Sequence, residues 1–147
     1  MNHERDYHIK HLELIQGVIN RQAQNSFAVK GWSLTLSAGI LTYLLSQSAS
    51  NLAHPAAYFI VVFPALTFWL LDGYYLRQER LFRCLYDEIR RTIGVEVPTR
   101  EIFTMDTTPY KAHVRYWRGA LWGKTVWLIP AMIVAASIVL FLTSNHP

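Results

Sequence analysis

Long apolar stretches alternate along the chain with stretches rich in charge. Apolar residues dominate at 28–48, 55–76 and 121–144, and each stretch approaches the roughly 20 residues that a helix needs to cross a bilayer core. The first stretch is shorter and carries Ser33, Ser37 and Thr42. Such hydroxyls are tolerated in a membrane helix when they bond to helix carbonyls or to a neighbouring helix. The pattern therefore predicts an all-α protein with three transmembrane spans.

Composition favours a membrane setting over a soluble core. Charged residues make up 16% of the chain, whereas soluble domains average about 25%. A soluble fold would have to bury three such helices within 147 residues, which small soluble domains rarely do. The single cysteine, Cys84, leaves no possibility of an internal disulfide. We expect one membrane domain that covers residues 1–147.

The polar stretch after the second apolar segment keeps a helical pattern. It reads LDGYYLRQERLFRCLYDEIRR at residues 71–91. The apolar residues Tyr75, Phe82, Leu85 and Ile89 recur there at steps of three, four or seven, so they share one side of a helix. The second span is therefore predicted to continue as an amphipathic cytoplasmic helix to about Thr92. An ordered loop and then a short amphipathic helix from about Pro109, which leads into span three, complete the segment 77–118.

The stretch before the first apolar segment has the same character. Apolar residues recur there at helical spacing, which predicts a cytoplasmic helix within residues 1–27 that leads into the first span. They are Ile9, Leu12, Ile15, Ile19, Ala23 and Phe27. The short uncharged link SQSASNLAHP makes the first two spans an antiparallel hairpin. We expect the two cytoplasmic extensions to pack on each other as an antiparallel pair. The alternative is that each lies flat on the inner leaflet.

Basic residues set the orientation. The link between spans one and two and the tail after span three contain no Lys or Arg, whereas the other two polar segments contain many. These basic residues are Arg5, Lys10, Arg21 and Lys30 before span one or at its first turn, and Arg77, Arg80, Arg83, Arg90, Arg91, Arg100, Lys111, Arg115 and Arg118 between spans two and three. Because Lys and Arg gather on the cytoplasmic side, the N-terminus is placed inside and the C-terminus outside. The net charge of +4 then reflects topology, and no nucleic-acid partner is predicted.

Motifs for catalysis are missing from the sequence. It has no Gly-rich phosphate loop and no G-x-S-x-G turn. The stretch HERDYHIKH at residues 3–11 approaches a zinc-protease motif, but three residues separate Glu4 from His8 where that motif has two. His8 and His11 are therefore interpreted as a solvated pair. We expect no enzyme, no metal site and no cofactor.

Two ionisable residues stand at the cytoplasmic ends of the first two spans. The hairpin brings Lys30 and Asp72 to the same level, which makes them candidates for an ion pair that acts as a gate. The alternative assigns them no function: Lys30 extends its ammonium to the headgroups, and Asp72 is a boundary carboxylate.

Polar side chains of span one and of the residues before it form a second candidate group. Its members are Asn25, Ser33, Ser37 and Thr42. They are expected either to line a pore that several copies form around span one or to serve helix packing within one chain. One sequence does not separate these alternatives.

Two motifs resemble a known family. NRQAQNSFAVKGWSLTLSAGI at 20–40 and the stretch at 71–91 resemble small bacterial helical membrane proteins of unknown function, and together they cover about a third of the chain. More loosely, the layout resembles the SLATT-type effectors of bacterial conflict systems. Those effectors pair a two-span hairpin with cytoplasmic helices and form pores in response to a nucleotide-signalling partner. A third span departs from their pattern. The resemblance implies a location in the bacterial inner membrane.

Two functional hypotheses follow. The first is a homo-oligomeric pore-forming or membrane-perturbing effector in phage defence, gated by its cytoplasmic helices. The second is a non-conducting adaptor that docks a soluble cytoplasmic signalling partner on the face formed by Tyr75, Phe82, Leu85 and Ile89. Polar residues on one face of span one favour the first hypothesis, and a monomer with a lipid-compatible exterior favours the second.

Overall fold

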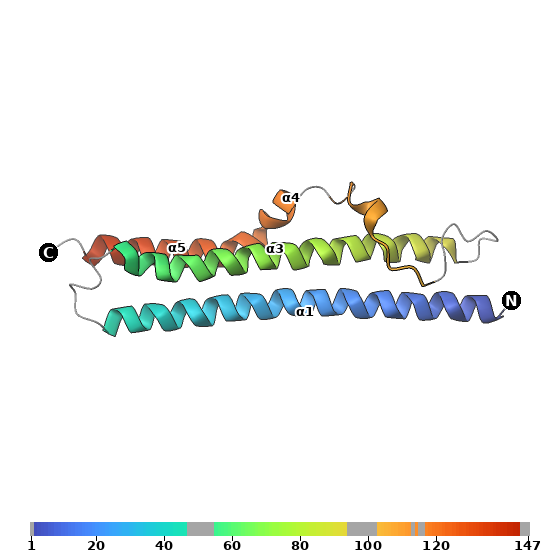
Figure 1. Cartoon of the computed structure of the whole chain (residues 1–147), viewed down its shortest axis with the longest axis horizontal. Helices are drawn as coiled ribbons and strands as arrows, with labels where there is room; N and C mark the ends of the chain where they lie inside the picture. The colour runs from blue at the N-terminus through green and yellow to red at the C-terminus, as the bar shows by residue number, and fades with distance from the viewer. Residues whose placement is uncertain (1, 47–54, 94–102, 113, 115–116, 145–147) are drawn as a thin grey trace.

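The computed structural model is an elongated helical bundle whose termini lie at opposite ends of its long axis (Figure 1). It describes residues 2–46, 55–93, 103–112, 114 and 117–144. The elements are α1, Asn2–Ser46; α3, Pro55–Thr92; the 3₁₀ helix η1, Thr108–Tyr110; α4, Trp117–Leu121; and α5, Lys124–Ser144. These described residues contain no strand, so the all-α prediction is confirmed.

The two long helices run through both the apolar and the charged parts of the chain without a break. α1 has 45 residues and α3 has 38, which correspond to lengths of about 68 and 57 Å. α3 begins at Pro55, whose fixed φ suits the first turn of a helix, and it ends at Thr92. The predicted continuation of each apolar segment into a charged helix is therefore confirmed.

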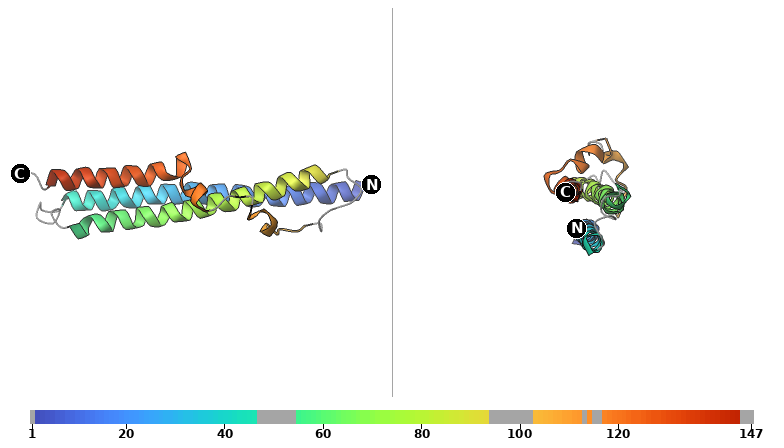
Figure 2. Two further views of the ribbon diagram at one scale, coloured as in Figure 1. Left: turned by 90° about the horizontal axis from the view of Figure 1, so that it is seen from above. Right: turned by 90° about the vertical axis from the view of Figure 1, so that its left-hand side faces the viewer.

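α1 and α3 lie side by side and antiparallel (Figures 1 and 2). At their charged ends the contact is an apolar core, in which Ile15 and Ile19 of α1 are buried against Leu85 and Ile89 of α3. Each side chain of this size contributes about 1.5–3 kcal/mol when it is fully buried. The predicted pairing of the two extensions is confirmed.

The buried line on α1 differs in part from the predicted one. Ile9 and Phe27 are exposed, Phe27 by 79%, whereas His11 and Ser26 are buried. Ile15 belongs to both lines. A helix that follows one partner over its whole length buries positions that alternate between steps of three and four residues. Ser26 stays on that line, and Phe27, one residue further, rotates away from α3.

α5 packs beside the half of α3 that begins at Pro55, so that end of the bundle has three helices (Figure 2). A second apolar core lies there, which we call the outer core. It comprises Val61, Ala65 and Ile133, with Ile40, Leu41, Leu44 and Ile129 packed against them.

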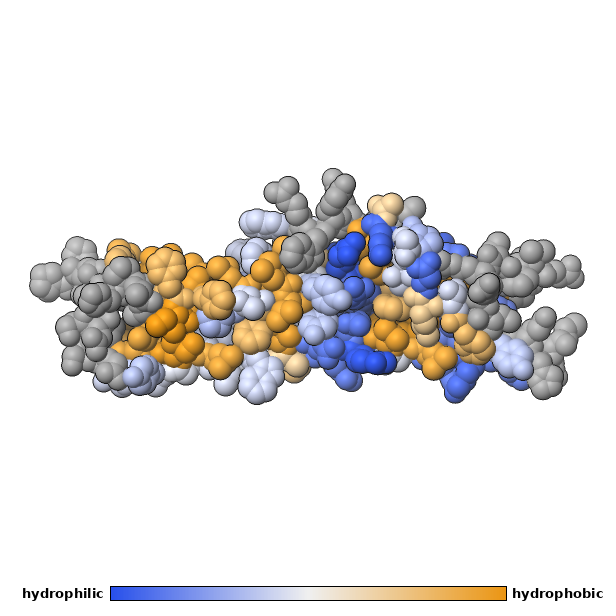
Figure 3. Space-filling model, viewed as in Figure 1, coloured by the Kyte–Doolittle hydropathy of each residue, from blue (hydrophilic) through white to orange (hydrophobic). Residues whose placement is uncertain are grey.

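Two helices are long and apolar enough to cross a membrane: α3 within Phe59–Thr92, and α5 over Val126–Thr143. Only 22% of the apolar window of each helix is buried, so most of its apolar side chains face outward. Figure 3 shows apolar surface gathered toward the C-terminal end, with the most hydrophilic side chains at the middle and the other end. The described part of α1 does not meet the same criterion, so the first span and the topology stay predictions.

The chain before the last helix is more broken than the sequence pattern predicts. A short amphipathic helix from about Pro109 that leads into span three is expected, but η1 ends at Tyr110 and α4 covers only Trp117–Leu121. α5 then starts separately at Lys124. The turn between them contains Gly123, whose carbonyl accepts a hydrogen bond from the N–H of Val126 at 2.8 Å. Glycine lowers helix stability, which favours the break at this point.

Candidate functional site: a buried polar seam

Lys30 and Asp72 form an ion pair between α1 and α3. The Nζ atom of Lys30 lies 2.6 Å from Oδ1 of Asp72. Asp72 is 2% exposed, whereas the Lys30 side chain is 24% exposed. The carboxylate is therefore enclosed, and the ammonium stands at the edge of the interface. A buried carboxylate without a partner costs several kcal/mol, so Lys30 is what allows Asp72 to carry a charge there.

Ser26 completes the site. Its hydroxyl donates a hydrogen bond to Oδ1 of Asp72 and accepts one from Nζ of Lys30 at 2.8 Å. Ser26 is buried and is absent from the residues that the sequence predicts for this site. Its signal in the sequence is the step of four residues to Lys30, which places both side chains on one face of a helix.

The second carboxylate oxygen of Asp72, Oδ2, takes no part in these hydrogen bonds. Oδ2 is buried and has no hydrogen-bond partner among the described residues. A small pocket adjoins Asp72 where α1, α3 and α5 meet, and it is also lined by Lys30, Ser33 and Ile129. The pocket has space of about 10 Å³, which is close to the minimum for one water molecule.

The ion pair belongs to a longer line of buried and half-buried polar side chains, which we call the polar seam. Its members are Gln22, Ser26, Lys30, Ser33 and Ser37 on α1, and Asp72 and Arg77 on α3. In the part of the chain that the structure describes, four buried side-chain atoms lack a hydrogen bond, and all belong to this seam: Gln22 Oε1, Ser37 Oγ, Asp72 Oδ2 and Arg77 Nε. Buried polar atoms are normally satisfied, so four such atoms on these two helices indicate water or a functional role.

The outer core ends the polar seam. Between Gln22 and Ser37 the seam extends over about 22 Å of α1. The next residues of α1 that face its neighbours are Ile40, Leu41 and Leu44, which pack against the outer core. The face that α1 turns to its neighbours is therefore polar from the charged half of the bundle to Ser37, and it is apolar beyond Ser37.

The predicted pore-lining residues do not share one surface. Ser33 and Ser37 are buried inside the chain, at 4% and 1% exposure. Thr42 is exposed, and its hydroxyl bonds back to the carbonyl of Ala38 at 2.8 Å. Asn25 is half-buried. In this conformation the two serines do not line an axis shared by several copies, because α3 and α5 cover the face that carries them.

The predicted partner-docking face is occupied within the chain. Leu85 and Ile89 are buried against α1, and Phe82 packs against the same core. Tyr75 is half-buried. The sequence pattern identifies an apolar face correctly, but α1 covers that face and leaves little of it for a soluble partner.

Residues 103–112 form what we call the strap, which contacts the charged ends of both long helices. His11 Nε2 of α1 lies 2.9 Å from the carbonyl oxygen of Thr104, and the hydroxyl of Tyr110 donates to Glu88 Oε2 of α3. The ring of Tyr110 packs against the core of α1 and α3. His11 is 2% exposed, so its interpretation as a solvated residue is wrong.

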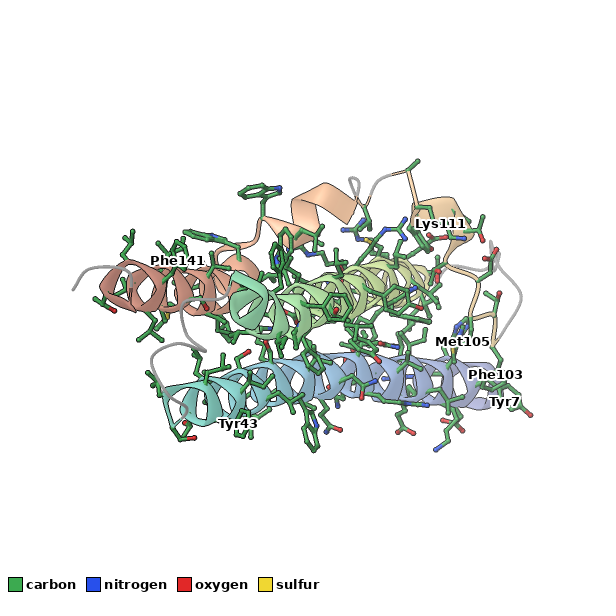
Figure 4. All side chains as sticks on the ribbon, turned by 60° about the vertical axis from the view of Figure 1, so that its left-hand side comes forward. Tyr7, Tyr43, Phe103, Met105, Lys111 and Phe141 are labelled. Atoms are coloured by element: carbon green, nitrogen blue, oxygen red, sulfur yellow. The ribbon has the colours of Figure 1, made fainter. Side chains whose placement is uncertain are left out.

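Aromatic contacts hold the first residue of the strap. Figure 4 shows Phe103 beside Tyr7 near the N-terminal end of α1, with Met105 close by. The ring centroids of Phe103 and Tyr7 are 6.3 Å apart, and that of His11 is 5.6 Å from Phe103. Phe103 has a φ of 70°, which is rare for a bulky residue. Surrounding contacts are needed to keep such a conformation.

The chain beyond the strap reaches the polar seam through α4. A Cβ atom on Gly73 would lie 2.5 Å from Cδ2 of Leu121, so only glycine lets Leu121 approach α3 this closely without a shift. The indole N–H of Trp69 donates to the carbonyl of Leu121 at 3.2 Å. Gly73 follows Asp72 directly, so α4 contacts α3 one residue along the chain from the ion pair.

The described side chains contain no group of three or more His, Cys, Asp or Glu that could hold a metal ion. The chain matches no family model, no curated protein and no solved structure. It is an all-helical protein with two helices suited to a bilayer and a polar seam between its two long helices.

Proposed function

We propose that this chain is an inner-membrane protein of three spans that permeabilises the membrane when its cytoplasmic part releases it. The polar seam is the observation that carries this proposal. Polar and charged side chains are costly inside a bilayer and mark ion or substrate pathways. Here they lie at the interface of helices whose outer surface is apolar. The outer core keeps the pathway shut, as hydrophobic constrictions do in channels.

Exposed side chains support a position of α1 in the membrane beside α3 and α5. Leu34, Leu36, Tyr43 and Leu45 of α1 are exposed, although α1 is less apolar than the other two helices. Trp32 is also exposed and lies two residues beyond Lys30. Tryptophan prefers the interface between headgroups and hydrocarbon, so Lys30 and Asp72 are assigned to the inner interface.

The proposed topology puts residue 50 on the outer side, although this residue lies outside the described residues. We expect a Ser50→Cys variant, made in a Cys84→Ser background, to react with a membrane-impermeant thiol reagent added to intact cells. An Arg91→Cys variant, in the charged helix, serves as the matched control and should react only after the cells are opened. Labelling of Ser50→Cys only in opened cells would rule out the proposed topology.

The strap is proposed to control whether the pathway opens. It joins the charged ends of α1 and α3 to α4, and α4 rests on Gly73 beside the ion pair. Loss of the Tyr110 contacts is therefore expected to loosen both the helix pair and the seam. We expect the wild-type protein to leave the membrane potential intact and a Tyr110→Ala variant to collapse it, measured with a potential-sensitive dye in cells that express each protein.

Tyr43→Ala is the control for this experiment, because it removes an exposed tyrosine from the other end of α1. Its cells should keep the potential of wild-type cells. If cells with Tyr110→Ala also keep their potential at equal protein levels, the strap does not control a pathway.

The proposal includes assembly of several copies and, by the resemblance to conflict-system effectors, a soluble signalling partner in phage defence. Gly31, Thr35 and Gly39 are exposed on α1, and a Cβ atom on either glycine would meet nothing within 4 Å. Small residues of this kind allow a second helix to approach closely. The mass of the protein in nanodiscs tests for a discrete oligomer.

A non-conducting adaptor is the second candidate. The observation that favours it is the length of α1, which exceeds a hydrocarbon core of about 30 Å roughly twofold. The charged half of the α1–α3 pair would therefore project into the cytoplasm as a stalk. Intact potential in every strap variant, together with a monomer in nanodiscs, would favour this candidate.

A further inference from the structure

Asp72 is the one carboxylate of the polar seam, and its surroundings limit what it can bind. Oδ1 is occupied by Ser26 and Lys30, whereas Oδ2 is buried and free among the described residues. A carboxylate oxygen accepts hydrogen bonds, so Oδ2 needs a hydrogen-bond donor. The adjoining pocket has space for about one water molecule.

Size excludes other small occupants. The one ammonium and the one carboxylate that line the pocket, those of Lys30 and Asp72, are paired with each other, so the lining offers no net charge that would hold a bare ion. Val126, Ile129 and Pro130, which α5 contributes to the lining, carry no charge. A hydrated ion is also larger than this space. Water and the proton that it carries are the remaining occupants that satisfy Oδ2.

We propose that the polar seam is a proton path in which a water molecule in the pocket delivers a proton to Oδ2 of Asp72. This inference rests on the proposed membrane-permeabilising function and names the ion that is moved. In the transfer, an O–H bond of a hydronium ion breaks and an O–H bond forms on Oδ2, which leaves water and a neutral carboxyl group. The proton leaves by the reverse step to water on the other side.

The free atoms of the seam mark the route on both sides of Asp72. Gln22 Oε1 and Arg77 Nε lie toward the charged half, and Ser37 Oγ lies toward the outer core. Ser33, which lies between Lys30 and Ser37 on α1, lines the same pocket as Asp72. Side chains that accept or donate one further hydrogen bond each are suited to hold single water molecules in a row. The path is complete only when the outer core opens beyond Ser37.

The test uses the full-length Tyr110→Ala protein in vesicles of phosphatidylethanolamine and phosphatidylglycerol. Proton entry is followed with an internal pH dye, and potassium and chloride release with ion-selective electrodes. We expect proton flux without potassium or chloride flux. Asp72→Asn should abolish the proton flux, and Ser37→Ala, a small change that the fold tolerates, should lower it severalfold. Thr42→Val removes an exposed hydroxyl of the same helix and should leave the flux unchanged.

The outcomes separate the inference from the function on which it rests. Potassium or chloride flux as large as the proton flux would leave a membrane-permeabilising protein but overturn the proton path. Proton flux that Asp72→Asn and Ser37→Ala both leave unchanged would place the path outside the seam. Absence of every flux from correctly inserted Tyr110→Ala protein would overturn the proposed function and the proton path together.

Discussion

Replacing Lys30 with Ala is expected to lower the free energy of unfolding by about 3–5 kcal/mol. The substitution removes the ammonium that lies 2.6 Å from Asp72 and leaves a carboxylate that is 2% exposed without a counter-charge. Ser26 still donates to Oδ1, but one hydroxyl does not offset the loss of solvation of a full charge. Reversible unfolding in mixed detergent micelles measures the change.

Substitutions of the two partners of the ion pair should lower the free energy of unfolding by different amounts. The Lys30 side chain is 24% exposed and can extend its ammonium to water, so Asp72→Asn should cost less than Lys30→Ala. Lys10→Ala is the matched control, because Lys10 pairs with Glu13 on an exposed surface and should lower the free energy of unfolding far less than Lys30→Ala. A Lys30→Met/Asp72→Leu double variant should recover most of the stability. If Lys30→Ala costs no more than Lys10→Ala, the ion pair between Lys30 and Asp72 does not stabilise the folded protein.

Leu85→Ala is expected to cost about 2–5 kcal/mol, because it opens a cavity in the core that joins the charged halves of α1 and α3. Leu85 is fully buried against Ile15 and Ile19. The same unfolding experiment measures this loss. Hydrogen exchange should also accelerate in both helices near this core, because each helix loses the partner that covers it.

Leu14→Ala is the control for this core, since Leu14 is a leucine of α1 with a half-exposed side chain. It should change the free energy of unfolding by well under the amount for Leu85→Ala. Equal losses for the two variants would show that the charged halves do not pack as described.

The helices and their pairing could be predicted because the sequence signals for them are local. Apolar spacing on both sides of Lys30 and Asp72 indicates continuous helices, and a short link makes them antiparallel. The level at which Lys30 meets Asp72 then follows from helix geometry. Periodicity identifies an apolar face, however, and does not state what covers it. For this reason Leu85 and Ile89 were predicted to dock a partner, although α1 covers them.

The contacts that the strap and α4 make with the long helices could not be predicted. The bond between His11 and Thr104 joins residues 93 positions apart, and no local pattern marks it. The close approach of Leu121 to Gly73 likewise depends on where α4 lies. The free atoms of Gln22, Asp72 and Arg77 become visible only when the facing helices are in place. A polar residue in the sequence gives no indication of whether its partner is present.

α1 passes from the charged half of the bundle to the apolar half as one helix of 45 residues that contains no proline. Sharp kinks in helices occur mostly at proline, so a helix of this kind is expected to move as one body. If the strap controls the protein as proposed, a turn of the charged end about the helix axis would carry Ser26, Lys30, Ser33 and Ser37 with it. The proposed control at one end and the proposed opening at the other would then be one rotation, with no flexible coupling between them.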